Sequence, residues 1–201
     1  LGDDAAAIDC ADKTQLVSTD LFIENIHFDI MYSPLMHVGY KCITASISDI
    51  CAMNAKPAQV LVSIALSSRY TLEAVEELYT GIQTACNNYN IELLGGDTSS
   101  SVSGLVISVT AIGYAEKNTL VRRSGAKVGD LVCVSGDLGG AYMGLQLLER
   151  EKLVFLDQKD MQPDLDAKDY VVGRQLRPEA RVDIVEAVPY TKLTLPTIHT
   201  V

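Results

Sequence analysis

Five aspartates stand where the sequence pattern calls for turns or apolar side chains. Asp3 and Asp4 lie in "GDDAA", Asp20 follows "QLVST", Asp49 lies inside "SISDICAM", and Asp97 follows "ELLGG". A buried carboxylate without a partner is costly, so Asp49, if it faces the core with its apolar neighbours, must be paired, hydrogen-bonded or bound to a metal ion. Oxygen-rich groups of this kind suit hard divalent cations, above all Mg²⁺, which in turn attract phosphate oxygens. With three histidines and no paired cysteine spacing, a zinc site is disfavoured.

Asp97 and Asp49 also have ordinary explanations when each is taken alone. Gly95, Gly96 and Asp97 read as a turn after the strand "IELL", because glycine and aspartate are common turn formers. Asp49 can lie on the solvent-exposed face of an amphipathic helix. The repeated placement of carboxylates, with Ser18 and Thr19 beside Asp20, favours one shared site over separate turns.

Strands and helices alternate through the first 115 residues. Apolar residues at three- and four-residue steps predict a helix over 35–53, which Asn54 and Pro57 end. Thr71 is expected to cap a second helix, which continues to about residue 85. The pattern predicts an α/β fold with strands over 15–20, 59–67, 91–94 and 104–115.

A turn-rich stretch near 115–130 predicts a domain boundary. We expect an N-terminal ATP- and Mg²⁺-binding domain at 1–115 and the start of a second domain at 116–187. In the second, 131–150 reads as a strand, a glycine loop and a helix, whose first amides either bind an anion or simply form a turn. An acidic loop over 157–169 precedes a helix over 177–187, with Pro178 in its first turn. Residues 188–201, rich in threonine and proline, are either a natural loop or strand or a foreign tail.

The amino-acid composition indicates which partners the protein can bind and in which compartment it works. The 201 residues carry a net charge of −10, and the only basic cluster, at Arg122, Arg123 and Lys127, is too small to bind nucleic acid. Five separated cysteines, an odd number, indicate a reducing cytoplasm. No apolar run is long enough for a membrane span. Because the first residue is Leu1 rather than Met, we expect the sequence to be a fragment.

The order and spacing of five motifs closely resemble the thiamine-monophosphate kinases, of the aminoimidazole ribonucleotide synthetase superfamily. These motifs are "GDDAA", "STD" followed by "NIHFD", "YKCITASISDICAMNAKP", "ELLGGDT" and "RRSGAKVGD". The resemblance covers about residues 2–187. The "HF" after "STD" favours this branch over selenophosphate synthetase and the hydrogenase-maturation enzyme.

The resemblance implies a homodimeric kinase that uses ATP and Mg²⁺ to convert thiamine monophosphate to thiamine diphosphate. By motif match, Gly95, Gly96, Asp97 and Arg123 would contact ATP, and His27 would contact the thiamine phosphate, although a lone histidine is more often a surface or packing residue. Asp20, Asp97 and Arg123 would take part in catalysis. The implied metal ligands are Asp4, Ser18, Thr19, Asp20, Asp49 and Asp97.

The sequence departs from the family pattern in two respects. Asn54 replaces the usual glycine after "AM", and it can adopt the same left-handed conformation. The Asp-x-Ser-Asp-Gly segment expected soon after "RPEAR" and a later Gly-Gly-Glu-Asp segment are missing. The alternatives are therefore another ATP-dependent enzyme of the superfamily, or a noncatalytic fragment that binds nucleotide or divalent cations.

Overall fold

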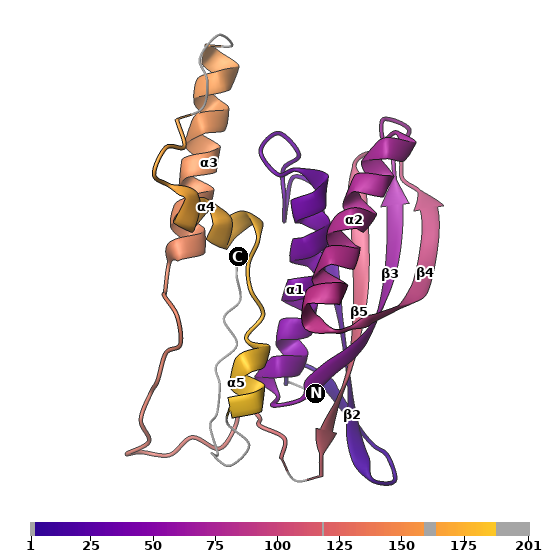
Figure 1. Ribbon diagram of the computed structural model, residues 1–201, viewed down its shortest axis with the longest axis vertical. Helices are drawn as coiled ribbons and strands as arrows, with labels where there is room; N and C mark the ends of the chain where they lie inside the picture. Colours follow the sequence, from indigo (N-terminus) through magenta and orange to yellow (C-terminus); the bar gives the residue numbers. More distant parts are fainter. Residues whose placement is uncertain (1–2, 118, 159–163, 188–201) are drawn as a thin grey trace.

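An open mixed β-sheet with two long helices on one face forms the first part of the chain (Figure 1). This computed structural model describes residues 3–117, 119–158 and 164–187. Within them the sheet has the strand order β1-β2-β5-β3-β4, with β3 and β4 parallel and the other neighbours antiparallel. The elements are β1 (Ala6–Asp9), β2 (Lys13–Ile23), α1 (Leu35–Ala52), β3 (Lys56–Leu66), α2 (Leu72–Tyr89), β4 (Glu92–Ser100) and β5 (Leu105–Glu116). The predicted α/β fold is confirmed.

Both helices begin and end close to the predicted residues. At the end of α1, Asn54 has a φ of 58°, the left-handed conformation that asparagine tolerates. The hydroxyl of Thr71 accepts a hydrogen bond from the Ala74 N–H (3.3 Å) and so caps α2. Asn90, with a φ of 53°, ends α2 and lets the chain turn into β4.

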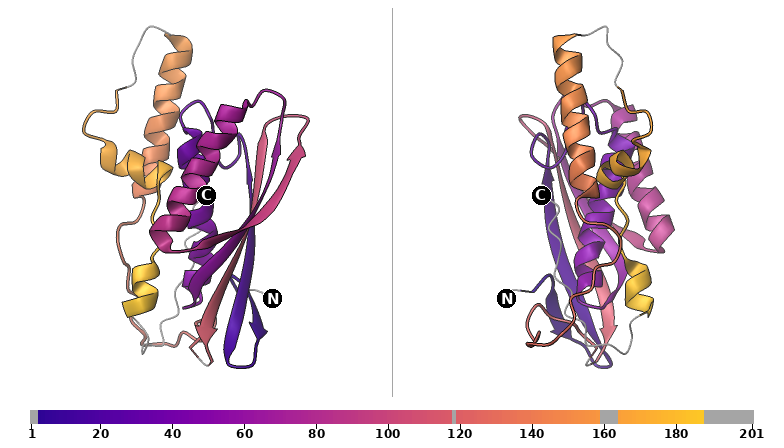
Figure 2. Two further views of the ribbon diagram at one scale, coloured as in Figure 1. Left: turned by 45° about the vertical axis from the view of Figure 1, so that its right-hand side comes forward. Right: turned by 90° about the vertical axis from the view of Figure 1, so that its left-hand side faces the viewer.

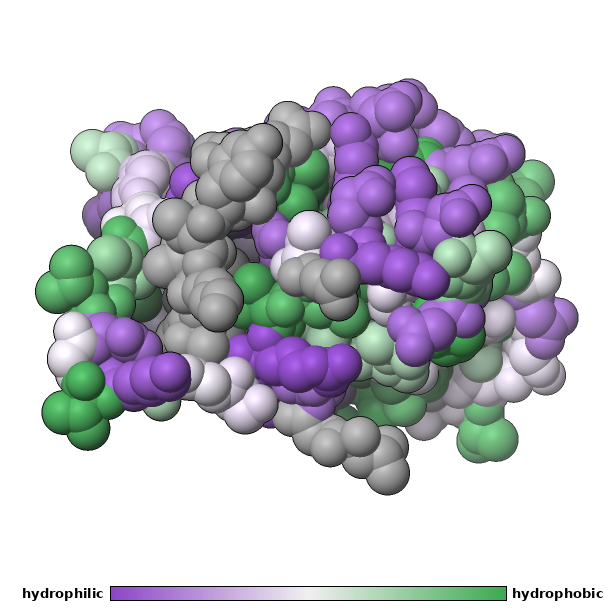
Figure 3. Space-filling view, turned by 90° about the horizontal axis from the view of Figure 1, so that it is seen from below, coloured by the Kyte–Doolittle hydropathy of each residue, from purple (hydrophilic) through white to green (hydrophobic). Residues whose placement is uncertain are grey.

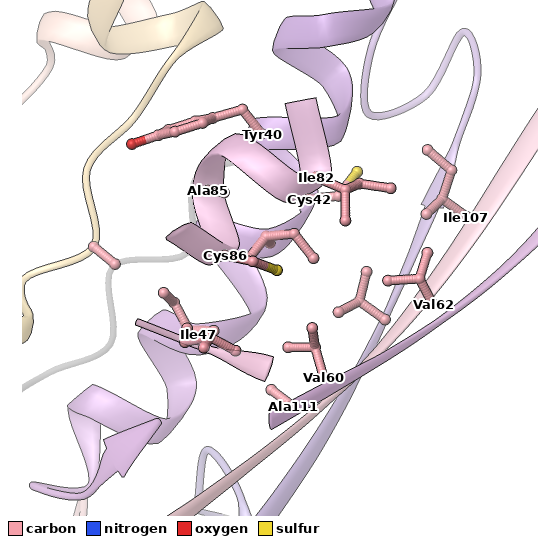
Figure 4. Close-up of a cluster of buried hydrophobic side chains, with 14 of the residues drawn as sticks. Tyr40, Cys42, Ile47, Val60, Val62, Ile82, Ala85, Cys86, Ile107 and Ala111 are labelled. Carbon is pink, nitrogen blue, oxygen red and sulfur yellow. The ribbon is translucent and has the colours of Figure 1, made fainter. Parts of the chain in front are cut away.

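The core fills the space between the two helices and the sheet. Side chains of both helices, including Ile47 and Ile82, meet Val62 and Ile107 of the central strands (Figure 4). The helices touch backbone to backbone, since a Cβ on Gly39 of α1 would lie 2.1 Å from the Leu78 carbonyl oxygen of α2. This close packing holds the sheet-facing side of α1 against β2 and β5.

The opposite face of the sheet is left uncovered by the described elements (Figure 2). Alternation along the strands points Leu21 of β2 and Leu61 of β3 toward this outer face, and their residues are 52% and 37% exposed. Thr19 and Thr110 lie between them on the same face, with their hydroxyl oxygens 3.3 Å apart. The outer face is therefore partly apolar and open to a partner.

The predicted turn at Gly95–Asp97 is wrong. These residues lie inside β4, which continues to Ser100 by pairing in parallel with β3. The register shifts between Val60 and Leu61, and Gly95 has a φ of 148°, so the two glycines serve an irregularity within a strand rather than a turn. Asp20 likewise lies within its strand, because β2 extends to Ile23.

Two predictions in the second part of the chain are also wrong. Residues 131–134 form no strand, and the side chains of Leu131 and Val132 are exposed, because no described segment pairs with them. Residues 177–181 are not helical; the last described helix starts at Val182, and the helix over 169–176 had not been predicted. The short strand β1 had not been predicted either. The tail at 188–201, and 159–163 of the predicted loop, lie outside the described residues.

Helices α3 (Gly140–Asp157), α4 (Asp169–Leu176) and α5 (Val182–Ala187) lie on the side of α1 and α2 that faces away from the sheet (Figure 2). The glycine loop followed by a helix at 140 is confirmed. Tyr40 of α1 points toward the connection between α4 and α5 (Figure 4), where the Arg177 guanidinium lies 4.9 Å from its ring centre. An open hollow of about 610 Å³ lies beside this contact and is lined by Tyr89 and Arg181 among others.

A partly buried ion pair joins α3 to the loop before α1. Lys152 of α3 lies 2.6 Å from the Asp29 carboxylate, and the Tyr32 hydroxyl donates to Glu149 (2.6 Å). Burial raises the pKa of Asp29, but hydrogen bonds from Lys152 and the Met31 N–H outweigh it, so that the pKa is lowered overall. These contacts hold the two parts of the chain together.

This lowered pKa predicts an acid-sensitive contact. The ionised Asp29 carboxylate favours the folded state at pH values above 3.8, its ordinary pKa, and this stabilisation is lost as the pH falls through the lowered pKa. Thermal unfolding between pH 6 and pH 3 should therefore show wild type losing its advantage over Asp29→Asn at the acid end. An Asp12→Asn variant, changed at an exposed carboxylate, serves as the control. Parallel profiles for wild type and Asp29→Asn would contradict the prediction.

Hydrophobic residues reach the surface at several places around the end of the molecule shown in Figure 3. No helix in the described ranges is long and apolar enough to cross a membrane.

All five cysteines are free; Cys42, Cys51 and Cys86 are buried, and Cys10 and Cys133 are exposed.

Candidate functional site

A small group of oxygen atoms lies between the start of the chain, β2 and α1. The Ser18 hydroxyl donates to the Asp49 carboxylate (2.8 Å) and lies 3.3 Å from the Asp4 carbonyl oxygen. The alternation of β2 points Ser18 toward α1, and Asp49 is on the side of α1 that faces the sheet. The structure thus brings together three residues, Asp4, Ser18 and Asp49, from three separate motifs.

Two arginines from the segment after β5 bind the two aspartates at the start of the chain. Arg123 lies 2.5 Å from the Asp4 carboxylate, whose side chain is 3% exposed, and Arg122 lies 2.6 Å from Asp3. The hydrogen bond from Arg122 lowers the pKa of Asp3 against the opposing effect of desolvation. Asp4 raises the pKa of Arg123, and Asp49 adds to this effect. Arg123 therefore shares this end of the site with the carboxylates of Asp4 and Asp49.

These oxygen donors fit a hard cation whose remaining ligands are water and phosphate oxygens. Among the described residues, no group of three or more histidine, cysteine or acidic side chains is close enough to hold a metal ion by itself. However, Mg²⁺ is commonly held by one or two carboxylates and completes its shell with water and phosphate oxygens. Asp4, Asp49 and Ser18 offer oxygen donors of that kind.

Asp20 and Thr19 follow Ser18 but point to opposite faces of the sheet. Asp20 lies on the same face as Ser18, roughly 7 Å farther along β2. Burial is the main cause of the raised pKa of the Cys42 thiol on α1, and the charge of Asp20 raises this pKa further. Thr19 points to the outer face, beside Thr110. Of these two, only Asp20 lies on the side of Asp49.

Gly96 and Asp97 lie on the far edge of the sheet. Through the register, Asp20 is level with Val109, Val62 and Gly96, three strand spacings or roughly 14 Å away. Asp97 is next to Gly96 and points to the outer face. In this single chain Asp97 is therefore separated from Asp49 by distance and by the sheet itself.

His27 lies beyond the end of β2 in an exposed turn. Its Nδ1 accepts a hydrogen bond from the Ile23 N–H (3.0 Å), so the neutral ring carries its proton on Nε2. Its ring meets the edge of Phe22, with centres 6.1 Å apart. The Asp4 group lies at Ser18 in the middle of β2, and Ile23 is roughly 17 Å farther along the strand, so His27 lies well away from that group, beyond the end of β2.

The sequence analysis missed the carboxylate that holds this turn. The Glu24 side chain is 3% exposed and forms an ion pair with Arg69. It also accepts hydrogen bonds from the Tyr70 hydroxyl (2.7 Å) and the Leu105 N–H (2.8 Å). The available signal was an acidic residue between Ile23 and Ile26, at the end of an apolar strand.

Comparisons with known proteins show the family to which the chain belongs. The sequence profile of the family described as AIR synthase related protein, N-terminal domain, matches residues 2–115. The chain belongs to this family. It is 37% identical over 185 residues to the thiamine-monophosphate kinase of Bacillus subtilis, covering 92% of this chain and 55% of that protein. The corresponding Aquifex aeolicus protein is 37% identical over 188 residues, covering 94% of this chain and 57% of that protein. The chain thus spans little more than half the length of these relatives.

Solved structures give the same picture. A structure of AaThiL complexed with AMPPCP and TMP superposes with a TM-score of 0.80 at 34% identity, covering 94% of this chain and 57% of that one. The hydrogenase maturation protein HypE gives a TM-score of 0.60 at 21% identity over 75% of this chain and 46% of that one, a likeness of fold alone. The resemblance drawn from the motifs is confirmed.

Proposed function

We propose that this chain is part of a kinase that transfers phosphate from ATP to thiamine monophosphate, with Mg²⁺, to give thiamine diphosphate. The observation that carries the proposal is the joining of Asp4, Ser18, Asp49 and Arg123 from four distant motifs. The names of the similar proteins support it, as does the AaThiL complex, because AMPPCP is an analogue of ATP.

The side chains suit the binding of two phosphate-bearing molecules. Mg²⁺ would be held by Asp4, Asp49 and Ser18, with Asp20 nearby, and would neutralise phosphate charge. Arg123 would turn from Asp4 to a phosphate oxygen and stabilise charge in the transition state. The Nε2–H of His27 would donate to the phosphate of thiamine monophosphate. An oxygen of that phosphate would bond to the γ-phosphorus as its bond to the bridging oxygen breaks, releasing ADP.

We also propose that the chain forms a homodimer through the outer face of its sheet. That face presents Leu21 and Leu61 without cover from the described elements. Thr19, Gly95 and Asp97, which the motifs assign to metal and nucleotide binding, lie on it too, away from Asp49. A partner at this face would give Asp97 a site that it lacks within one chain.

A charged residue on the outer face should disrupt this dimer. Leu61→Glu places a carboxylate in the middle of the proposed interface, where desolvation without a partner is costly. We expect wild type to run at dimer mass in light scattering and Leu61→Glu at monomer mass. Leu72→Glu, an exposed leucine on α2, should remain dimeric. A monomeric wild type at micromolar concentration would contradict the proposal.

One alternative has a specific observation in its favour. The chain covers only 55% of the length of its Bacillus subtilis relative. This coverage favours the alternative that the chain binds nucleotide without turning it over. A different acceptor within the superfamily is the other alternative, and the likeness to HypE supports it only at the level of fold.

Formation of ADP tests the proposed function. The chain is incubated with Mg²⁺ and ATP, with and without thiamine monophosphate, and ATP binding is measured by calorimetry in parallel. Turnover that requires thiamine monophosphate supports the kinase. Binding without turnover supports the noncatalytic alternative, and no binding by folded protein argues against both.

Two further assignments belong to the same proposal. We propose a division into an N-terminal ATP- and Mg²⁺-binding domain over 1–115 and the start of a second domain over 116–187, supported by the extended segment that follows β5. We also propose a cytoplasmic location. It is supported by the five free cysteines, of which Cys10 and Cys133 are exposed.

A further inference from the structure

Lys41 lies on the side of α1 that faces neither the sheet nor α2. At helical spacing, Ala45 and Ser48 follow it at one and two turns, and Asp49 lies beside Ser48 on the flank toward β2. These four residues are all half-buried. This strip of α1 therefore borders the Asp4 group.

Within the described parts of the chain the ammonium group of Lys41 forms no ion pair or hydrogen bond, although the residue is half-buried. Burial lowers the pKa of Lys41 accordingly. By contrast, Arg122, Arg123 and Arg69 each contact a carboxylate. Partial burial of a cation without a partner is unfavourable, and it stands out in a protein that has 26 acidic residues.

The surroundings of Cys42 place Lys41 near the proposed site. Burial is the main cause of the raised pKa of the Cys42 thiol; the charge of Lys41 lowers this pKa, and the charge of Asp20 raises it further. Both charges therefore act at the same point of α1. Lys41 thus adds a positive charge at the Asp20 end of the proposed site, roughly 12 Å along α1 from Asp49.

We propose that Lys41 is a phosphate-binding residue of this site, which contacts a phosphate oxygen of either ATP or thiamine monophosphate. A bound phosphate would supply the counter-charge that the shielded ammonium lacks. The inference rests on the proposed function and adds to it a residue that the motif assignments do not contain.

The competing explanation is packing. Lysine often buries its methylene stem along apolar surface while its ammonium reaches water. The two roles differ in the property that a neutral replacement changes. Loss of a packing stem lowers stability, whereas loss of an unpaired charge leaves stability unchanged or increases it and weakens only the binding of the anion.

The test compares Lys41→Met with Lys41→Arg, using Lys117→Met as the control at an exposed lysine. Calorimetry measures the binding of AMPPCP with Mg²⁺ in one arm and of thiamine monophosphate in the other, and thermal unfolding is recorded for each variant. We expect Lys41→Met to weaken one ligand at least tenfold at an unchanged or higher melting temperature. Lys41→Arg should retain part of the affinity, and the affected arm identifies the phosphate.

Several results would overturn the inference. Wild-type affinity of Lys41→Met for both ligands, with or without a lower melting temperature, would leave only the packing role. Equal losses in Lys41→Met and Lys41→Arg would show that the charge is not what matters. Both results leave the proposed function standing, whereas a wild-type chain that binds neither ligand would contradict the proposed function and the inference together.

Discussion

Replacing Asp49 with asparagine is expected to weaken the Mg²⁺-dependent binding of ATP by about 10- to 100-fold or more without unfolding the protein. The amide oxygen can still accept the hydrogen bond from Ser18 that Asp49 accepts at 2.8 Å. What is lost is the negative charge, on which a hard cation depends. Calorimetry with AMPPCP, with and without Mg²⁺, and circular dichroism melting measure the two parts of the prediction.

Two further variants test whether the cation site lies within one chain or is shared between two subunits. Asp12→Asn, at an exposed carboxylate in the turn before β2, should leave binding unchanged. If a partner subunit supplies Asp97, Asp97→Asn should weaken binding too, although Asp97 and Asp49 lie on opposite faces of the sheet in one chain. Unchanged affinity of Asp49→Asn would mean that the group around Ser18 does not hold the cation.

Helices α1 and α2 could be predicted because their signals are local. The apolar spacing of α1, the left-handed Asn54 and the Thr71 cap each act within a few residues, and all three are found in the structure. By contrast, β4 passes through Gly95 and Gly96 because β3 offers it hydrogen-bonding partners on one side. That pairing is not local, so a turn signal was misread.

A strand was predicted at 131–134 and is not found, because a local strand signal there has no partner strand. Its β-branched and apolar residues favour a strand, but strand propensity measures how well a side chain packs on a sheet, and no described segment offers one. Val132 is therefore exposed in an extended segment. Composition alone could not show the absence of a neighbouring strand.

For the site, residue types were predictable and placement was not. The alternation of β2 separates Ser18 and Asp20 from Thr19, and this could have been read from the sequence. The pairing of Asp4 with Arg123, which are 119 residues apart, depends on the path of the chain after β5. The distance of Asp97 from Asp49 likewise follows from strand order, which motifs do not encode.

The buried carboxylate of Glu24 predicts the largest loss of stability. We expect Glu24→Ala to lower the free energy of unfolding by about 3 kcal/mol, because the Tyr70 hydroxyl and the Leu105 N–H both lose their acceptor. Arg69 adds less, since its side chain is 50% exposed and water can solvate it. Glu24→Gln should cost about half as much, as its amide oxygen still accepts a hydrogen bond. Urea unfolding measures all of these values.

A surface ion pair on the same sheet provides the control. Glu116 lies 3.5 Å from Lys13, and its side chain is 70% exposed, so Glu116→Gln should change stability by less than about 1 kcal/mol. The difference between the two sites reflects burial, because an acceptor removed from a buried cluster is not replaced by water. A loss for Glu24→Ala no larger than that for Glu116→Gln would mean that water reaches this cluster, and the turn carrying His27 would then need another support.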